Sequence, residues 1–94
     1  MRALTAGELR ELRRAAQSLK ARITVGRAGL SDALVAQVRQ ALAQTPLLKV
    51  RVGAQDRDAI DAIGRRLSAE VPCVLVSRIG FVLTLYRPAD SDSS

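Results

Sequence analysis

The sequence contains no histidine, no tryptophan and a single cysteine, Cys73. A lone cysteine cannot form a disulfide within the chain, and without histidine the commonest metal ligand and the usual general base are both missing. The only aromatic side chains are Phe81 and Tyr86, which argues against a sheet that binds nucleic acid by stacking bases on several aromatics. These absences disfavour zinc chemistry and acid–base catalysis, so we expect no enzymatic activity, no metal ion and no cofactor.

Long hydrophobic runs are also missing. No uninterrupted apolar segment approaches the roughly 20 residues that span a bilayer, and the first residues, MRALTAGELR, lack the apolar core of a signal peptide. We therefore expect a cytoplasmic protein that is a monomer and has no membrane partner. With 94 residues the chain suffices for one small domain. We place this domain at residues 1–88 and interpret the polar segment ADSDSS, residues 89–94, as a disordered tail.

Positive charge is concentrated near the start of the chain. The chain carries 15 basic and nine acidic residues, a net charge of +6, and residues 1–30 hold seven of the basic but only two of the acidic ones. Arginine supplies 13 of the 15 positive charges, and its planar guanidinium suits bidentate contacts with phosphate. This asymmetry is typical of a surface that binds a polyanion.

The first half of the chain contains two segments with the periodicity of amphipathic helices. Thr5 and Glu8 form a T-x-x-E capping box, which predicts a helix over residues 5–19. Ser31 is a typical N-cap and predicts a second helix, which Pro46 ends.

A third helix is expected over residues 56–69, with Asp61 and Arg65 one turn apart as an exposed ion pair. Its other early carboxylates, Asp56 and Asp58, fit the helix dipole and lack the spacing of a calcium loop. Cys73 lies in an apolar strand, so it is interpreted as a small buried hydrophobe and not as a nucleophile.

Alternating and β-branched apolar residues predict four strands, at residues 23–25, 47–53, 72–78 and 81–86. We place the turn between the last two at Ile79 and Gly80, because glycine adopts the positive φ that a two-residue connection often requires. The order α-β-α-β-α-β-β predicts a compact single α/β domain with a four-stranded mixed sheet and three helices, in two or three layers.

The segment ITVGRAGLSD, residues 23–32, places two glycines three residues apart just before an expected helix N-terminus. A G-x-x-G pattern taken alone is more often a structural corner. Here free backbone N–H groups and the helix dipole favour an anion, and glycines let a phosphate approach without a Cβ in the way. A comparable loop clamps the backbone of single-stranded nucleic acid in KH domains. We therefore assign candidate phosphate contacts to Gly26, Arg27, Ala28, Gly29 and Ser31.

The expected first helix carries a basic face opposite its leucines. Only two acidic residues balance this face, which favours a ligand surface over a merely solvated one. The candidate phosphate contacts from this helix and the segment after it are Arg10, Arg13, Arg14, Lys20 and Arg22. Additional candidates are Arg78 and two residues, Lys49 and Arg51, that could equally solvate one face of the sheet.

The segments LTAGELRELRRAAQSLKARITVGRAGLSDALVAQVRQAL, LLKVRV and IGFVLTLYRP together resemble the YhbY-type CRM domain, the chloroplast RNA-splicing and ribosome-maturation module. The resemblance covers about residues 4–88. It implies a fold similar to the C-terminal domain of bacterial translation initiation factor three, with an RNA-binding surface made by the glycine loop and neighbouring basic side chains. Stand-alone prokaryotic members are associated with precursors of the large ribosomal subunit. The resemblance therefore implies ribosomal RNA of that subunit as partner, and a role in ribosome maturation.

Three positions depart from the usual pattern of that family. Ala21 stands where many relatives have proline, Arg27 preserves the charge of a common lysine, and Phe81 replaces a basic residue that commonly follows the glycine. Two alternatives to RNA binding remain at this point. One is a protein-interaction adaptor that docks an acidic partner on the same basic patch. The other, a phosphate-binding enzyme, is weaker because no lysine and serine or threonine follow the loop as in a P-loop.

Overall fold

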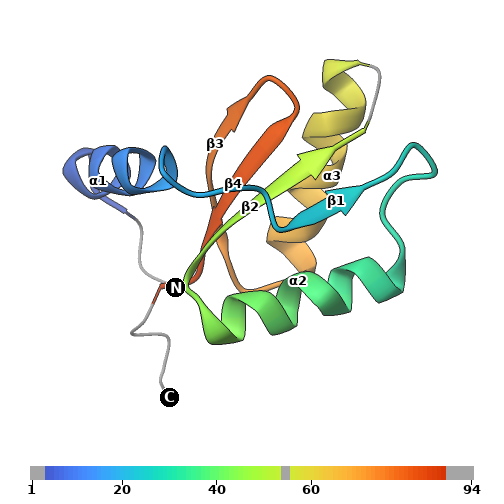
Figure 1. Ribbon diagram of the computed structural model, residues 1–94, viewed down its shortest axis with the longest axis horizontal. Coiled ribbons are helices and arrows are strands. Elements are labelled where there is room, and N and C mark those ends of the chain that lie inside the picture. The colour runs from blue at the N-terminus through green and yellow to red at the C-terminus, as the bar shows by residue number, and fades with distance from the viewer. Residues whose placement is uncertain (1–3, 54–55, 89–94) are drawn as a thin grey trace.

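The computed structural model describes residues 4–53 and 56–88, which form three helices and four strands (Figure 1). In chain order the elements are α1 (Ala6–Ala16), β1 (Ile23–Val25), α2 (Asp32–Gln44), β2 (Leu47–Val52), α3 (Arg57–Glu70), β3 (Val74–Ile79) and β4 (Val82–Tyr86). The predicted element order and the four-stranded mixed sheet are confirmed. The expected tail at residues 89–94 lies outside the described residues. None of the helices in the two described ranges has both the length and the apolar character to cross a bilayer.

The strands form one sheet in the order β1-β2-β4-β3. β1 is parallel to β2, whereas β4 is antiparallel to both of its neighbours. The carboxyl ends of β1 and β2 therefore lie at the same edge of the sheet as the β3–β4 turn, and we name it the loop edge. Two backbone hydrogen bonds of 2.7 Å join its parts, from the Gly53 N–H to the Val25 carbonyl and from the Val52 N–H to the Phe81 carbonyl.

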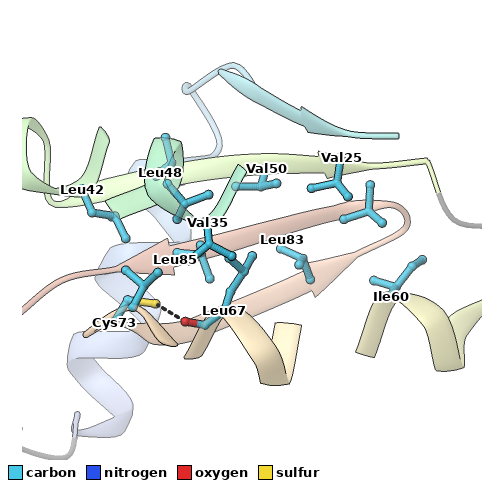
Figure 2. Packing of buried hydrophobic residues seen from close by; sticks show 13 residues of the cluster. Val25, Val35, Leu42, Leu48, Val50, Ile60, Leu67, Cys73, Leu83 and Leu85 are labelled. Carbon is cyan, nitrogen blue, oxygen red and sulfur yellow. Dashed lines mark hydrogen bonds between the residues drawn. The ribbon is translucent and has the colours of Figure 1, made fainter. Parts of the chain in front are cut away.

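α2 and α3 pack on one face of the sheet and enclose the main hydrophobic core (Figure 2). β2 alternates as predicted, with Leu48, Val50 and Val52 buried in this core. The helix residues buried in it are Val35, Val38 and Leu42 of α2 and Ile60 and Leu67 of α3. Each such side chain contributes about 1.5–3 kcal/mol by leaving water. A slip of β2 by one residue would move Leu48, Val50 and Val52 out of this core. Their burial therefore fixes the register of β2 and the position of the loop edge.

α1 packs against the opposite face of the sheet, across β2, β3 and β4, so the domain has three layers (Figure 1). Its capping box forms as predicted. The Thr5 hydroxyl accepts a hydrogen bond from the Glu8 N–H at 3.1 Å, and the Glu8 carboxylate accepts one from the Thr5 N–H at 2.9 Å. α1 leaves part of this face open, and Thr24 of β1 and Arg51 of β2 are exposed there.

α1 ends at Ala16, whereas the sequence predicted a helix as far as Leu19. The ammonium group of Lys49, on β2, donates hydrogen bonds to the carbonyl oxygens of Ala16 at 2.9 Å and Leu19 at 3.2 Å. The Ala16 carbonyl, which also accepts from the Leu19 N–H at 3.0 Å, thus gains a second donor at the end of the helix, where carbonyl groups lack intrahelical partners. Leu19, the last residue of the predicted helix, is 38% exposed. A side chain from another element thus ends the helix early.

The β3–β4 turn is displaced by one residue from its predicted place. Ile79 pairs with Val82, so Gly80 and Phe81 form the connection. Gly80 provides the expected positive φ, 57°, but from the first position of the turn. Phe81 therefore lies at the loop edge.

The predicted ion pair between Asp61 and Arg65 is also wrong. The guanidinium of Arg78, on β3, donates to the Asp61 carboxylate at 2.7 Å instead. α3 packs against β3, and this tertiary contact gives Asp61 a partner that a one-turn spacing along the helix does not reveal.

Candidate nucleic-acid interface

The GRAG loop, residues 26–29, leaves the sheet where Val25 is fully buried and enters α2 through Ser31. The Gly29 N–H donates to the Gly26 carbonyl at 3.0 Å, which closes a four-residue turn with Arg27 and Ala28 exposed at its centre. Gly29 has φ = 94°, a conformation that residues with a Cβ rarely adopt. The loop is therefore an ordered turn that presents the Arg27 side chain to solvent.

The two glycines differ in what the fold requires of them. A Cβ at Gly26 would meet nothing within 4 Å, and the backbone there has no positive φ. A Cβ at Gly29 would also meet open space, but its φ demands glycine. A structural corner thus accounts for Gly29 and does not account for Gly26. The space in front of both residues is open to a ligand that approaches the backbone closely.

Ser31 caps α2 as predicted. Its hydroxyl accepts a hydrogen bond from the Leu34 N–H at 3.2 Å, so the Ser31 side chain is already engaged within the protein. The next residue, Asp32, places a carboxylate in the first turn of α2 with its side chain almost wholly exposed. A negative charge at this position opposes an incoming phosphate.

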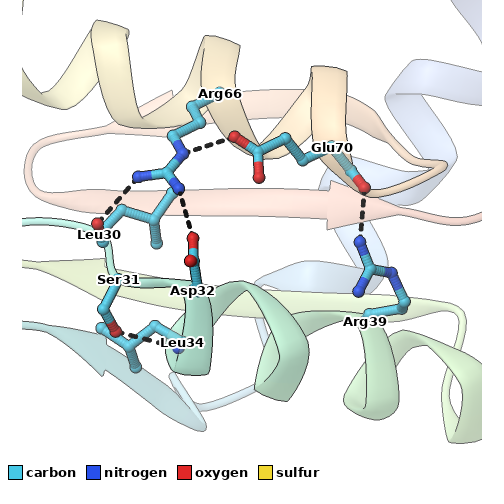
Figure 3. A network of polar contacts seen from close by, with 7 residues as sticks. All are labelled: Leu30, Ser31, Asp32, Leu34, Arg39, Arg66 and Glu70. Carbon is cyan, nitrogen blue, oxygen red and sulfur yellow. Dashed lines mark hydrogen bonds and ion pairs between the residues drawn. The ribbon is translucent and has the colours of Figure 1, made fainter.

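Arg66, on α3, connects to this helix start, and sequence analysis did not identify it (Figure 3). Its guanidinium donates to the Leu30 carbonyl at 2.9 Å and to the Asp32 carboxylate at 3.1 Å, and it also pairs with Glu70 at 2.5 Å. The Glu70 carboxylate, followed by Asp32, raises the pKa of Arg66. Arg66 thus fixes the residue after the GRAG loop and partly neutralises Asp32. The only sequence signal was its spacing of four from Glu70.

The arginines predicted on α1 separate into two kinds. Arg10 and Arg14 are exposed and, with Gln17, line a shallow depression of about 430 Å³. Arg13 turns toward the sheet, where its Nε and Nη2 both donate to the Val76 carbonyl at 3.3 Å. Arg13 therefore also joins α1 to β3.

The three additional candidates are likewise unequal. The Lys49 ammonium is bound to carbonyls at the end of α1, and Arg78 is paired with Asp61. The Arg51 side chain is exposed, and its guanidinium makes no hydrogen bond or ion pair with any residue in the described part of the chain. Of the three, Arg51 has the guanidinium most free for a ligand.

The structure does not bring the α1 arginines and the GRAG loop into one pocket. α1 covers β2, β3 and β4, whereas the GRAG loop follows β1 at the other side of the sheet, and Figure 1 shows the two at opposite ends of the molecule. Arg22, before β1, and Arg51, on β2, are exposed. Thr24 is the β1 partner of Arg51 in the sheet. A ligand that contacts both basic regions must therefore be extended.

In residues 4–53 and 56–88, no three potential His, Cys, Asp or Glu ligands group together where they could hold a metal ion. Asp56 is the N-cap of α3, where its carboxylate accepts from the Ala59 N–H at 2.8 Å. Burial raises the pKa of the Cys73 thiol to about 11, and its sulfur lies 3.8 Å from the Leu67 carbonyl oxygen. The thiol is therefore protonated at neutral pH.

The chain is similar to a known domain family, to a known protein sequence and to a solved structure. The model of the CRS1 / YhbY (CRM) domain matches residues 4–87. A Haemophilus influenzae protein named RNA-binding protein is 30% identical over 90 residues, which cover 96% of this chain and 91% of that protein. The solution structure of SAV1595 from Staphylococcus aureus, described as a candidate RNA-binding protein, has a TM-score of 0.83 at 25% identity and covers 97% of this chain and 95% of its own. The similarity thus extends over nearly the whole fold.

Proposed function

The chain belongs to the CRS1 / YhbY (CRM) domain family, and from this premise we propose that it is an RNA-binding module whose GRAG loop contacts backbone phosphates. Two similar proteins that are described in terms of RNA binding support the general class. The finer assignment to precursors of the large ribosomal subunit, and to their maturation, is supported by the resemblance to stand-alone members of the family. The module acts by binding, without catalysis.

The observation that carries the proposal is the open space at Gly26. Neither backbone conformation nor packing requires glycine there, whereas close approach of a phosphate to the backbone does. The N-terminus of α2 follows the loop directly, and its dipole favours an anion. Arg27, exposed at the centre of the turn, adds a positive charge beside it.

The separation of the basic regions determines the kind of RNA that fits. Arg27 and Arg51 lie near the loop edge, and Arg10 and Arg14 lie on α1. An RNA that contacts both regions must run its sugar–phosphate backbone along the open face of the sheet. Its affinity then depends chiefly on phosphate contacts and on RNA shape. A structured site in ribosomal RNA meets this requirement.

A protein-interaction adaptor is the second candidate function. Ile79 is 74% exposed and Phe81 is 51% exposed, and both lie at the loop edge beside basic residues. Exposed apolar side chains next to positive charge would suit an acidic protein partner. RNA binding is favoured because this alternative does not account for Gly26.

The test is RNA binding by a Gly26→Asp variant, measured by fluorescence anisotropy over a range of salt concentrations. The wild-type protein is expected to give a log–log salt slope of about −0.7 to −0.9 per phosphate neutralised. The variant is expected to bind at least about tenfold more weakly, because its carboxylate occupies the open space and repels phosphate. Ala62→Glu is the matched control, since it adds the same charge at an exposed position of α3.

Circular dichroism must show the same helical content in both variants. Equal affinity of the wild type and Gly26→Asp would contradict the role of the loop. In cells, crosslinks to large-subunit ribosomal RNA that disappear in Gly26→Asp would support the proposed partner. Association with ribosomal particles that survives RNase treatment would favour the adaptor.

A further inference from the structure

A groove of about 340 Å³ lies between α1 and the sheet, on the face away from the main core. Gln17, just after α1, forms part of one wall, together with the side chain of Arg13. Because the charged ends of Arg13 and Lys49 are hydrogen-bonded to carbonyl groups, it is their hydrocarbon stems that remain available to line the groove. The groove therefore carries less positive charge than the presence of an arginine and a lysine among its lining residues indicates.

One side chain that lines the groove is both polar and buried. Thr84 of β4 is only 3% exposed and lines the groove. Among the described residues, its hydroxyl has no hydrogen-bond partner, which is unusual because buried hydroxyls are normally paired. Ser77 of β3 is its partner in the sheet register and lines the same groove. The groove therefore offers two neighbouring hydroxyls and the Gln17 amide, a set of both donors and acceptors.

The rest of the groove is apolar toward the loop edge. Ile79 and Val82 face each other across β3 and β4 and both line the groove. Ile79 is the most exposed large apolar side chain in the described residues. An apolar surface beside hydroxyl and amide groups matches a nucleobase, which has a flat apolar face and polar edges.

The groove continues into the surface proposed for the RNA backbone. Val82, at its open end, pairs in register with Arg51 of β2, and Arg51 pairs with Thr24 of β1, which lies two residues before Gly26. Neighbouring strands are about 4.8 Å apart, so β4 lies roughly 10 Å from β1. A few nucleotides of single-stranded RNA can therefore contact the GRAG loop and Arg51 while one base reaches the groove.

We infer that this groove is a base-binding site, which accepts one unpaired nucleobase of the bound RNA against Ile79 and Val82 and contacts its polar edge through Thr84, Ser77 and Gln17. This inference rests on the proposed RNA-binding function and adds base discrimination to it. Backbone contacts supply most of the affinity, and the groove supplies the preference for one base over another.

The experiment compares binding of fluorescein-labelled ten-nucleotide oligo(U), oligo(A) and oligo(C) to the intact chain and to Thr84→Val. Valine has nearly the shape of threonine, so the variant removes the hydroxyl and preserves the fold. The wild type is expected to bind its best homopolymer at least about fivefold more tightly than its worst. In Thr84→Val this ratio is expected to fall to about twofold or less.

Thr84→Ser, which keeps the hydroxyl, is the matched control and is expected to retain the wild-type ratio. A wild-type ratio near one, or a preference that Thr84→Val leaves unchanged, would overturn the base-binding site alone. Failure of the wild type to bind any of the oligonucleotides or a structured ribosomal RNA fragment would overturn the proposed function, and the inference with it.

Discussion

The Lys49 ammonium lies 2.9 Å from the carbonyl oxygen of Ala16, so that a side chain of β2 caps the end of α1. Lys49→Met keeps the hydrocarbon stem but leaves the carbonyls of Ala16 and Leu19 without this donor. We expect the free energy of unfolding to fall by about 1–2 kcal/mol, with about 4–8 °C lost in Tm per kcal/mol. Chemical denaturation measures the change. Lys20→Met is the control, since Lys20 is exposed, and an equal loss there would refute the cap.

Replacement of Arg51 is expected to change RNA binding, whereas replacement of Arg78 is expected to change stability. Arg51→Ala removes an exposed guanidinium, so the magnitude of the log–log salt slope should decrease by about 0.7–0.9, with stability within about 0.5 kcal/mol of the wild type. Arg78→Ala breaks a partly exposed ion pair with Asp61 and should cost about 0.5–1 kcal/mol with little effect on the slope. Salt titrations and urea denaturation test both expectations. The reverse pattern would make Arg78 the RNA contact.

Asp32 is expected to weaken RNA binding, because its carboxylate lies in the first turn of α2 beside the GRAG loop. Asp32→Asn should increase RNA affinity by about twofold to fivefold at low salt, and the gain should shrink as added salt screens the charge. Asp32→Glu keeps the charge and should bind like the wild type. Anisotropy titrations at low and high salt measure the difference, and a decrease in affinity for Asp32→Asn would place the phosphate elsewhere.

Cys73 is expected to make stability decrease at high pH. Burial raises the pKa of its thiol from 9.0 to about 11, so the folded state holds the proton more tightly than the unfolded state does. The contribution of the neutral thiol is fully present below pH 9 and is lost as the pH rises toward 11. The difference in stability between the wild type and Cys73→Ala should decrease over this range. A stability difference between the two proteins that does not change with pH would contradict the raised pKa of Cys73. Rapid reaction of the native thiol with a disulfide reagent at pH 8 would contradict it as well.

Features that depend on near neighbours in the sequence were predictable. The caps at Thr5 and Ser31 form between groups three residues apart, and the alternation of β2 follows from the pleat of a strand. The resemblance to the CRM family rested on sequence segments shared with that family, whereas the element order followed from such local patterns. Local physics was enough for these because each interaction closes within one helical turn or one strand.

Features that depend on tertiary placement were not predictable. Lys49 ends α1 from a position 33 residues away from Ala16, and Arg66 reaches Leu30 across 36 residues. Arg13, predicted beside the basic face of the first helix, also donates to the carbonyl of Val76 on β3, 63 residues away. In each case a long cationic side chain bound a distant backbone carbonyl. Spacing along the sequence carries no information on such pairs.

Three hydrogen bonds hold the GRAG loop and the residues on either side of it. The Gly29 N–H donates to the Gly26 carbonyl, the Gly53 N–H to the Val25 carbonyl, and the Arg66 guanidinium to the Leu30 carbonyl. The backbone at Gly53 also runs so close that a Cβ there would lie 3.3 Å from the Val25 carbonyl oxygen. The conformational entropy of the loop is therefore lost when the domain folds and not when a ligand arrives. A ligand that fits this preorganised turn retains more of its contact energy as affinity, and a mutation that loosens any of the three attachments would weaken binding without touching the ligand.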